Sequence, residues 1–327
     1  MTFYPNNQAG GSISERVSGR SCGGYPAIHA GSGPEARASG FVPPGTRPRR
    51  TSWRGLGHLV LAALVAAAAA APAAWAQERA GQGGKAGDTY KPMVGQEGKD
   101  VVWVPTPQVL VEKMLDIAQV TPRDTLIDLG SGDGRTVITA AKRGLRARGV
   151  EYNPQMVELA RRNATQAGVA DRATFVTADL FKTKLGDADV ITMFLLPTIN
   201  EQLRPRLLDL KPGTRIVSNS FRMGDWQPDR SETVREGCDH YCTALLWIVP
   251  AKVEGTWRLA GQELRLRQKY QMLSGTLGGA AISDARLDGD RIRFTVGDAS
   301  YAGTVNGRAM QGTVSGGAGG SWAATRL

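Results

Sequence analysis

Two kinds of hydrophobic pattern divide the chain at about residue 250. Before this point, short apolar runs alternate with segments in which apolar residues recur at helical spacing, as in residues 109–118. The apolar runs cover residues 125–127, 149–151, 173–177, 190–196, 215–220 and 243–249. Strands that alternate with helices are typical of a parallel sheet, so the pattern predicts an α/β fold for residues 101–250.

After residue 251 the helical spacing disappears. Short alternating runs such as residues 256–259, 263–268 and 291–296 follow one another, and glycine-rich turns separate them. The sequence Asp288-Gly289-Asp290 is a candidate hairpin turn. The pattern predicts a small antiparallel β domain over residues 251–327, built as a sheet or partial barrel of about six strands.

The N-terminal part has the composition of a leader. Residues 1–46 are rich in Gly, Ser and Pro and are predicted to be disordered. A basic segment at residues 47–54 precedes an apolar run at residues 59–71, and small residues follow up to Ala76. This order predicts a signal peptide within residues 1–76, cleaved after Ala76, and a bacterial protein exported to the periplasm.

Export has one alternative, in which residues 56–76 are retained and the protein stays cytoplasmic or anchored to the membrane. The apolar run is short and consists mostly of alanine, which makes a weak membrane span. Residues 77–100 are polar and glycine-rich, as expected of a linker. Association with the membrane or envelope is a further expectation of this organisation.

The formal net charge of +10 changes this picture little. Residues 1–76 hold seven arginines and two acidic residues, so the leader accounts for half of the excess. The remaining excess is modest for the rest of the chain and does not indicate binding to nucleic acid.

The run Asp128-Leu129-Gly130-Ser131-Gly132-Asp133-Gly134-Arg135 joins the first predicted strand to a predicted helix. Glycines allow positive φ and close approach of a ligand, and the free amides of a helix start bind anionic groups. The spacing is G-x-G-x-G, which differs from the G-x-G-x-x-G of dinucleotide binders.

Three acidic residues, Asp128, Glu151 and Asp179, end three successive predicted strands. In a doubly wound sheet, these strand ends line one crevice where ligands bind. A carboxylate at the second position can accept hydrogen bonds from both hydroxyls of a ribose. The sequence therefore predicts a nucleoside-binding crevice at this edge of the sheet.

This arrangement resembles the class I methyltransferases that use S-adenosylmethionine (SAM). The resemblance implies that Gly130 to Gly134 face the methionine part of SAM, that Glu151 binds its ribose, and that Asp179 binds its adenine amino group beside Leu180. The full set of cofactor-binding residues that it implies is Thr106, Asp128, Gly130, Ser131, Gly132, Asp133, Gly134, Glu151, Asn153, Asp179 and Leu180.

A closer resemblance covers roughly residues 101–230. Besides the glycine run, it includes Pro105-Thr106-Pro107, Asp179-Leu180-Phe181, Phe194-Leu195-Leu196-Pro197 and Met223-Gly224-Asp225-Trp226. These motifs are similar to a protein-lysine methyltransferase family that includes the enzymes acting on the c-ring protein of the mitochondrial ATP synthase and on the adenine nucleotide translocase. The resemblance implies a Rossmann-like seven-stranded sheet and methylation of a lysine ε-amino group in a protein substrate.

The substrate side of the site is less defined. Methyl transfer to lysine requires a neutral amine aligned with the methyl carbon in the absence of water. Pro197, Asn219 and Trp226 are the candidates for this side, and the sequence shows no convincing general base. Two alternatives remain open: an exported binding protein that keeps the fold without catalysis, and a methyltransferase acting on a small molecule.

The chain carries a second notable cluster in Cys238-Asp239-His240-Tyr241-Cys242. In an oxidising compartment the two cysteines can form a disulfide if they lie in a non-helical loop. Two free buried thiols or a metal site are the alternatives, although the cluster has few ligands for a metal. Thr106 is also expected to cap a helix that begins near Pro107.

Overall fold

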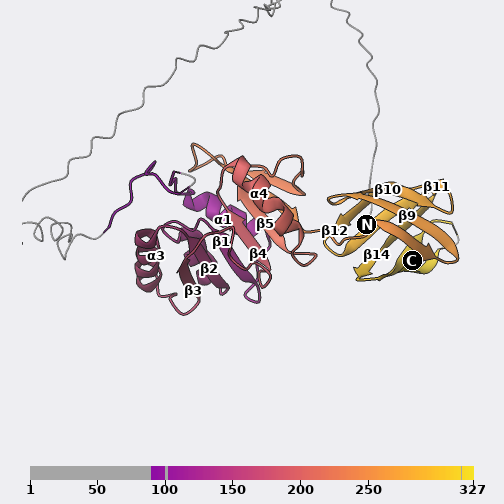
Figure 1. Ribbon diagram of the computed structural model, residues 1–327, viewed down its shortest axis with the longest axis horizontal. Helices are drawn as coiled ribbons and strands as arrows, with labels where there is room; N and C mark the ends of the chain where they lie inside the picture. The colour runs from indigo at the N-terminus through magenta and orange to yellow at the C-terminus, as the bar shows by residue number, and fades with distance from the viewer. Residues whose placement is uncertain (1–89, 100–101, 318) are drawn as a thin grey trace, which may run out of the picture. The chain divides into compact units, whose positions relative to one another are not determined.

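The computed structural model describes residues 90–99, 102–317 and 319–327 (Figure 1). The predicted leader, its cleavage site at Ala76 and most of the linker lie outside these residues. Within the described ranges, no helix has both the length and the apolar character needed to span a bilayer.

In the described part of the chain, seven strands form a mixed sheet in the order β3-β2-β1-β4-β5-β7-β6. The strands are β1 (Thr125–Leu129), β2 (Arg146–Glu151), β3 (Ala173–Thr177), β4 (Val190–Met193), β5 (Arg215–Asn219), β6 (Arg230–Thr233) and β7 (Thr243–Ile248). Strands β1 to β5 are parallel, whereas β7 runs antiparallel to β5 and β6. The predicted Rossmann-like α/β class is confirmed.

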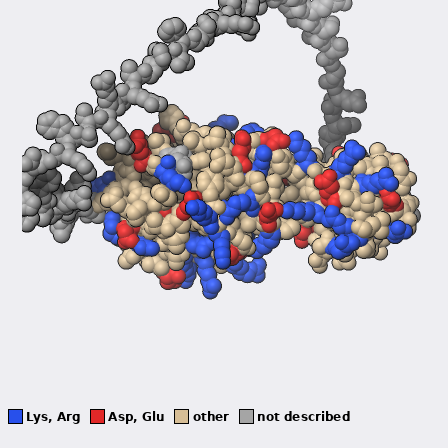
Figure 2. Space-filling view, viewed as in Figure 1, with Lys and Arg blue, Asp and Glu red and all other residues tan. Residues whose placement is uncertain are grey.

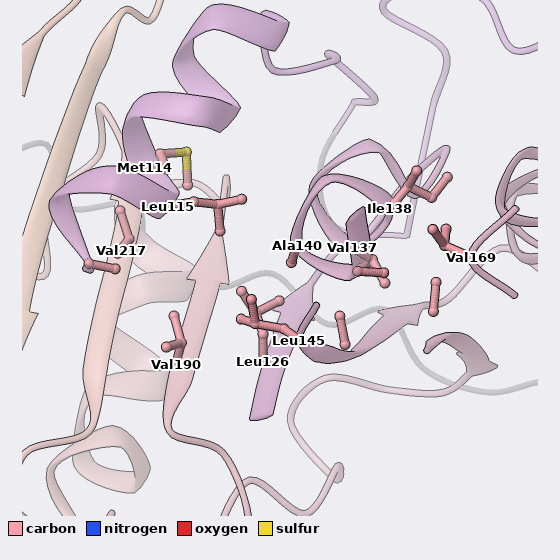
Figure 3. Close-up of a cluster of buried hydrophobic side chains, with 14 of the residues drawn as sticks. Met114, Leu115, Leu126, Val137, Ile138, Ala140, Leu145, Val169, Val190 and Val217 are labelled. Carbon is pink, nitrogen blue, oxygen red and sulfur yellow. The ribbon is translucent and has the colours of Figure 1, made fainter. Parts of the chain in front are cut away.

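The helices within the described residues are α1 (Gln108–Ile117), α2 (Arg135–Lys142), α3 (Pro154–Gln166) and α4 (Pro197–Leu208). Side chains point alternately to the two faces of a strand, so Leu126 belongs to one buried cluster and Ile127 to the other. Figure 3 shows the first cluster, in which Leu126 and Val190 from the sheet lie beside Leu115 of α1 and Val137 of α2. Helix α4 contributes to the second cluster, so helices cover both faces.

Acidic and basic side chains are interspersed on the face shown in Figure 2. Several of them pair across elements. Arg215 at the start of β5 lies 2.5 Å from Asp124, just before β1, and Arg143 at the end of α2 lies 2.7 Å from Asp116 of α1. Some charged side chains of the described chain therefore form ion pairs that hold neighbouring elements together.

The C-terminal strands form a closed barrel, where the sequence predicted a sheet or partial barrel of about six strands. The strands are β8 (Gly255–Leu259), β9 (Gln262–Lys269), β10 (Met272–Leu277), β11 (Ala280–Ala281), β12 (Ser283–Asp288), β13 (Arg291–Val296), β14 (Ala299–Asn306), β15 (Ala309–Ser315) and β16 (Gly320–Arg326). Eight of these described strands close the barrel through the β9–β10 pairing, and β11 adds to β10. The prediction undercounted because strands such as β14 and β15 contain few large apolar residues, so no clear alternating run marks them.

The barrel interior depends on a pair of glycines. Gly303 of β14 and Gly312 of β15 lie directly opposite each other. A Cβ atom on Gly303 would lie 2.6 Å from the ring of Trp322, and one on Gly312 would lie 1.9 Å from the carbonyl oxygen of Ala302. The absence of a side chain at Gly303 leaves space for the Trp322 ring, and its absence at Gly312 lets β15 approach β14 closely.

Hydrogen bonds join the barrel to the segment between β5 and β6. The indole nitrogen of Trp226 donates to Gln271 Oε1 at 2.9 Å, and the indole nitrogen of Trp247 donates to the carbonyl oxygen of Trp226 at 2.9 Å. The Trp226 ring also stacks on Tyr270, with 5.6 Å between ring centroids. Trp226 is therefore shared between the core of the first sheet and the start of the barrel.

Candidate active site

A cavity of about 400 Å³ lies at the carboxyl ends of the parallel strands. Its walls come from the loop between β1 and α2, the residues that follow β2, β3 and β4, and the segment before α1. Crossover connections place these strand ends at one edge of the sheet, which is where doubly wound proteins bind ligands. The predicted crevice is therefore present as a formed cavity.

The glycine run adopts the backbone conformation that its composition predicts. Gly132 has φ of +52°, and a Cβ atom there would lie 2.6 Å from the indole nitrogen of Trp103. Gly134 precedes α2 with φ of +84°, and a Cβ atom there would lie 2.7 Å from the ring of Phe175. Gly132 lines the cavity, whereas Gly134 allows the start of α2 to pack closely on β3.

Asp128 lies at the inner end of the cavity, and only 6% of its surface is exposed. Burial raises the pKa of its carboxyl from 3.8 to about 7, although a hydrogen bond from Thr192 Oγ1 at 2.6 Å favours the ionised form. The nearby charges of Glu151 and Asp133 raise this pKa further. A cationic ligand in the cavity would favour the ionised form of this carboxyl.

Glu151 is the last residue of β2, and its carboxylate forms hydrogen bonds with the loops around it. Its carboxylate accepts hydrogen bonds from the amides of Gly132 and Asn153, both at 3.0 Å. The Asn153 side chain accepts a hydrogen bond from the amide of Gln155, and Pro154 is the first residue of α3. One carboxylate thus links the glycine run to the start of the next helix.

Asp179 follows β3 and is half-buried. Its carboxylate accepts hydrogen bonds from the amide of Phe181 at 2.9 Å and from Lys99 Nζ at 3.1 Å. These contacts lower the pKa of Asp179, with the Phe181 amide contributing most. Asp179 lines the same cavity as Asp128 and Glu151, together with Leu180.

Thr106 lines the cavity but does not cap α1. The N-cap of α1 is Pro107, which has no capping side chain, so the predicted cap is wrong. Thr106 Oγ1 instead accepts a hydrogen bond from Asn219 Nδ2 at 3.3 Å, and its carbonyl oxygen accepts one from Arg135 at 2.9 Å. Arg135 also pairs with Asp133 at 2.6 Å, which fixes the entry to α2.

The three residues proposed for the substrate side do not line this cavity. Pro197 is exposed at the first position of α4. Asn219 is fully buried and contacts Thr106, and Trp226 is fully buried against Trp247 and Tyr270. Tertiary packing determines where these three side chains lie. The sequence motif gives no indication of this packing.

Three aromatic rings that sequence reasoning missed lie at the outer end of the cavity. We call Phe194, Phe221 and Tyr241 the aromatic mouth. Their ring centroids are 5.3–5.8 Å apart in all three pairs, and all three residues line the cavity. Each ring follows or precedes a different strand, so only the folded sheet brings them together.

Cys238 and Cys242 form a disulfide in the loop between β6 and β7. Of the three alternatives from the sequence, the structure therefore has the disulfide. Among the described residues, no group of three or more His, Cys, Asp or Glu side chains is arranged to hold a metal ion.

Comparison with known proteins agrees with this architecture. The family profile described as ANTKMT methyltransferase domain matches residues 128–230. A protein-lysine N-methyltransferase of Saccharolobus islandicus is 42% identical over 152 residues, which are 46% of this chain and 94% of that enzyme. The adenine nucleotide translocase lysine N-methyltransferase of mouse is 40% identical over 131 residues, which are 39% of this chain and 56% of that enzyme. The chain thus spans little more than half the length of this mouse relative.

A solved structure, an RNA methyltransferase from Salinibacter ruber with S-adenosyl-L-homocysteine, is 45% identical and has a TM-score of 0.43. The match covers 46% of this chain and 96% of that one.

The family match, together with the fold and the cavity, defines a methyltransferase that uses SAM. The residues present fit this cofactor, because the carboxylates of Asp128, Glu151 and Asp179 line the cavity beside the glycine run. With a relative matched over nearly its whole length, the chain belongs to the protein-lysine N-methyltransferase family.

Proposed function

We propose that this cavity binds SAM against Asp128, Glu151 and Asp179 and that the target lysine of a protein enters through the aromatic mouth. The observation that carries this proposal is the continuity of the cavity. One cavity is lined both by the acidic residues at the strand ends and by the three aromatic rings. These rings offer apolar surface to the long alkyl stem of a lysine side chain.

The residues at the outer end receive an amine that must lose its proton before it accepts the methyl group. Lysine has a pKa of about 10.4 in water, so it arrives mostly as the ammonium ion, which the faces of aromatic rings attract. Phe194, Leu195, Ile199 and Phe221 supply apolar walls there. These walls also exclude water from the reacting atoms, while Glu151 and the glycine run would orient the cofactor.

We also propose that the enzyme is exported and methylates a protein of the bacterial envelope. The predicted leader ending at Ala76 supports export. The disulfide between Cys238 and Cys242 supports an oxidising compartment, because such bonds persist there and are rare in the cytoplasm. Fractionation of cells that produce the full chain would test this, and recovery of the full-length protein in the cytoplasm would contradict it.

Radiolabelled SAM tests the reaction directly. The full chain is incubated with an extract of its host cells, and the protein fraction is then hydrolysed to amino acids. We expect label in methylated lysine and little label when Glu151→Ala replaces the wild type. Label in RNA or in small molecules would overturn the lysine assignment, and SAM binding without any transfer would favour a binding protein.

A further inference from the structure

Tyr241 holds an unusual position in the aromatic mouth. It lies inside the five-residue loop that the disulfide between Cys238 and Cys242 closes. Its φ is +56°, a conformation that side chains larger than asparagine rarely adopt. The ring is 46% exposed, yet it lies 5.3 Å from the ring of Phe194 and 5.4 Å from that of Phe221. The loop therefore has an unfavourable backbone conformation at Tyr241, and with it the ring lies at the cavity.

The same ring lies between two spaces. Tyr241 and Phe194 line the cofactor cavity, and they also line an outer hollow of about 650 Å³. Pro105, Pro107 and Asp239 form other parts of the outer hollow. A peptide segment in the outer hollow would therefore place a lysine side chain against Tyr241 on its way inward.

Building on the proposed function, we propose that Phe194, Phe221 and Tyr241 form the binding site for the alkylammonium group of the target lysine, and that the disulfide holds Tyr241 in place. The faces of aromatic rings attract cations, and methylated ammonium groups are held by clusters of such rings. The amine lone pair forms the new N–C bond as the C–S bond breaks, so positive charge passes from sulfur to nitrogen. The rings would then face this developing charge, and the extra proton on nitrogen leaves to solvent.

An NMR titration tests the site without depending on the identity of the protein substrate. The probe is Nα-acetyl-Nε-trimethyl-lysine amide, added to the full chain loaded with S-adenosyl-L-homocysteine. We expect an upfield shift of the trimethylammonium signal and weaker binding of the neutral tert-butyl analogue. Tyr241→Phe should keep the affinity, whereas Tyr241→Leu should weaken it by roughly 5- to 30-fold.

Two further variants separate the role of the ring from that of the loop. Replacing both cysteines by serine should weaken probe binding about as much as Tyr241→Leu. Glu236→Ala, a change at an exposed residue two positions before the disulfide loop, should have no effect. Equal affinity for the cation and its neutral analogue, or unchanged affinity in Tyr241→Leu, would overturn the ring site. Unchanged affinity in the serine variant would overturn the role of the disulfide.

Calorimetry with S-adenosyl-L-homocysteine distinguishes these failures from a failure of the proposed function. Cofactor affinity should be the same in all of these variants, because Tyr241 lies at the outer end of the cavity. A wild-type protein that binds no cofactor would refute the proposed function itself. Normal cofactor binding and lysine methylation together with unchanged probe affinity in Tyr241→Leu would refute the ring site alone.

Discussion

Replacing Asp128 by asparagine removes a proton-binding group from a buried position and keeps the shape of the side chain. Burial raises the pKa of this carboxyl from 3.8 to about 7, despite the hydrogen bond from Thr192. The folded protein therefore keeps the Asp128 proton at pH values where the unfolded chain has lost it. As a result, the free energy of unfolding falls as the pH rises between these two pKa values and is constant above the higher one.

The size of this effect follows from the pKa difference. Each pH unit well between the two values costs roughly 1.36 kcal/mol, and the slope halves at the higher pKa, so the loss between pH 5 and pH 7 is about 2 kcal/mol. Asparagine does not titrate. The stability of Asp128→Asn relative to the wild type should therefore rise by about 2–3 kcal/mol from pH 5 to pH 8, whatever constant cost the asparagine itself adds.

Urea unfolding of the full chain at pH 5, 6, 7 and 8, followed by tryptophan fluorescence, measures this difference. Asp171→Asn, which alters an exposed carboxyl, is the matched control and should run parallel to the wild type. Parallel profiles for Asp128→Asn and the wild type would refute the reasoning, because they would show that burial does not raise this pKa.

The same carboxyl should couple SAM binding to pH. SAM carries a positive sulfonium group and a positive ammonium group, so its binding near Asp128 should favour the ionised carboxyl. We expect release of up to one proton on binding at pH 6 and an affinity that rises by up to about fivefold between pH 6 and pH 7. Calorimetry in two buffers of different ionisation enthalpy measures the proton release, and Asp128→Asn should abolish it.

Three further changes test other parts of the structure. Glu151→Gln should lower SAM affinity about tenfold or more, because charged hydrogen bonds contribute roughly 1.5–3 kcal/mol, and unchanged calorimetric affinity would contradict the ribose assignment. Gly134→Ala should lower the free energy of unfolding by about 1–3 kcal/mol, because its φ is +84° and its Cβ would lie 2.7 Å from Phe175. Trp226→Phe leaves buried Gln271 Oε1 unpaired and should cost about 1–3 kcal/mol in urea unfolding without changing SAM affinity. Loss of SAM binding by a folded Trp226→Phe protein would show that the indole does reach the cofactor.

The sequence predicted those parts of the fold that local pattern determines. Strands β1, β4 and β7 are mostly buried apolar runs, and the acids at the ends of β1, β2 and β3 follow from chain order in a doubly wound sheet. Strand β6 (Arg230–Thr233) was not predicted from its residues, because its side chains are polar and mostly exposed. Backbone pairing with β7 at the sheet edge creates this strand, and no apolar run marks it.

The substrate side could not be predicted for a different reason. Trp226 occupies a recognisable motif, but its partners Tyr270 and Gln271 lie more than 40 residues later in the chain. The aromatic mouth has the same origin, since Phe194, Phe221 and Tyr241 come from three separate strand ends. Contacts between distant segments decide these positions, and a single sequence carries no periodic mark of them.

The barrel reaches the proposed lysine site through one short segment. Phe221 of the aromatic mouth lies five residues before Trp226, whose indole nitrogen donates to Gln271 beside the barrel strands. Helix α4 also contacts this segment, because Asn200 Nδ2 donates a hydrogen bond to the carbonyl oxygen of Phe221 at 3.3 Å.

Tyr270 and Gln271, at the start of the barrel, contact Trp226, so the barrel is placed to fix the backbone that carries Phe221. Loosening this contact should therefore weaken binding of the alkylammonium group while the acidic end of the cavity continues to bind SAM.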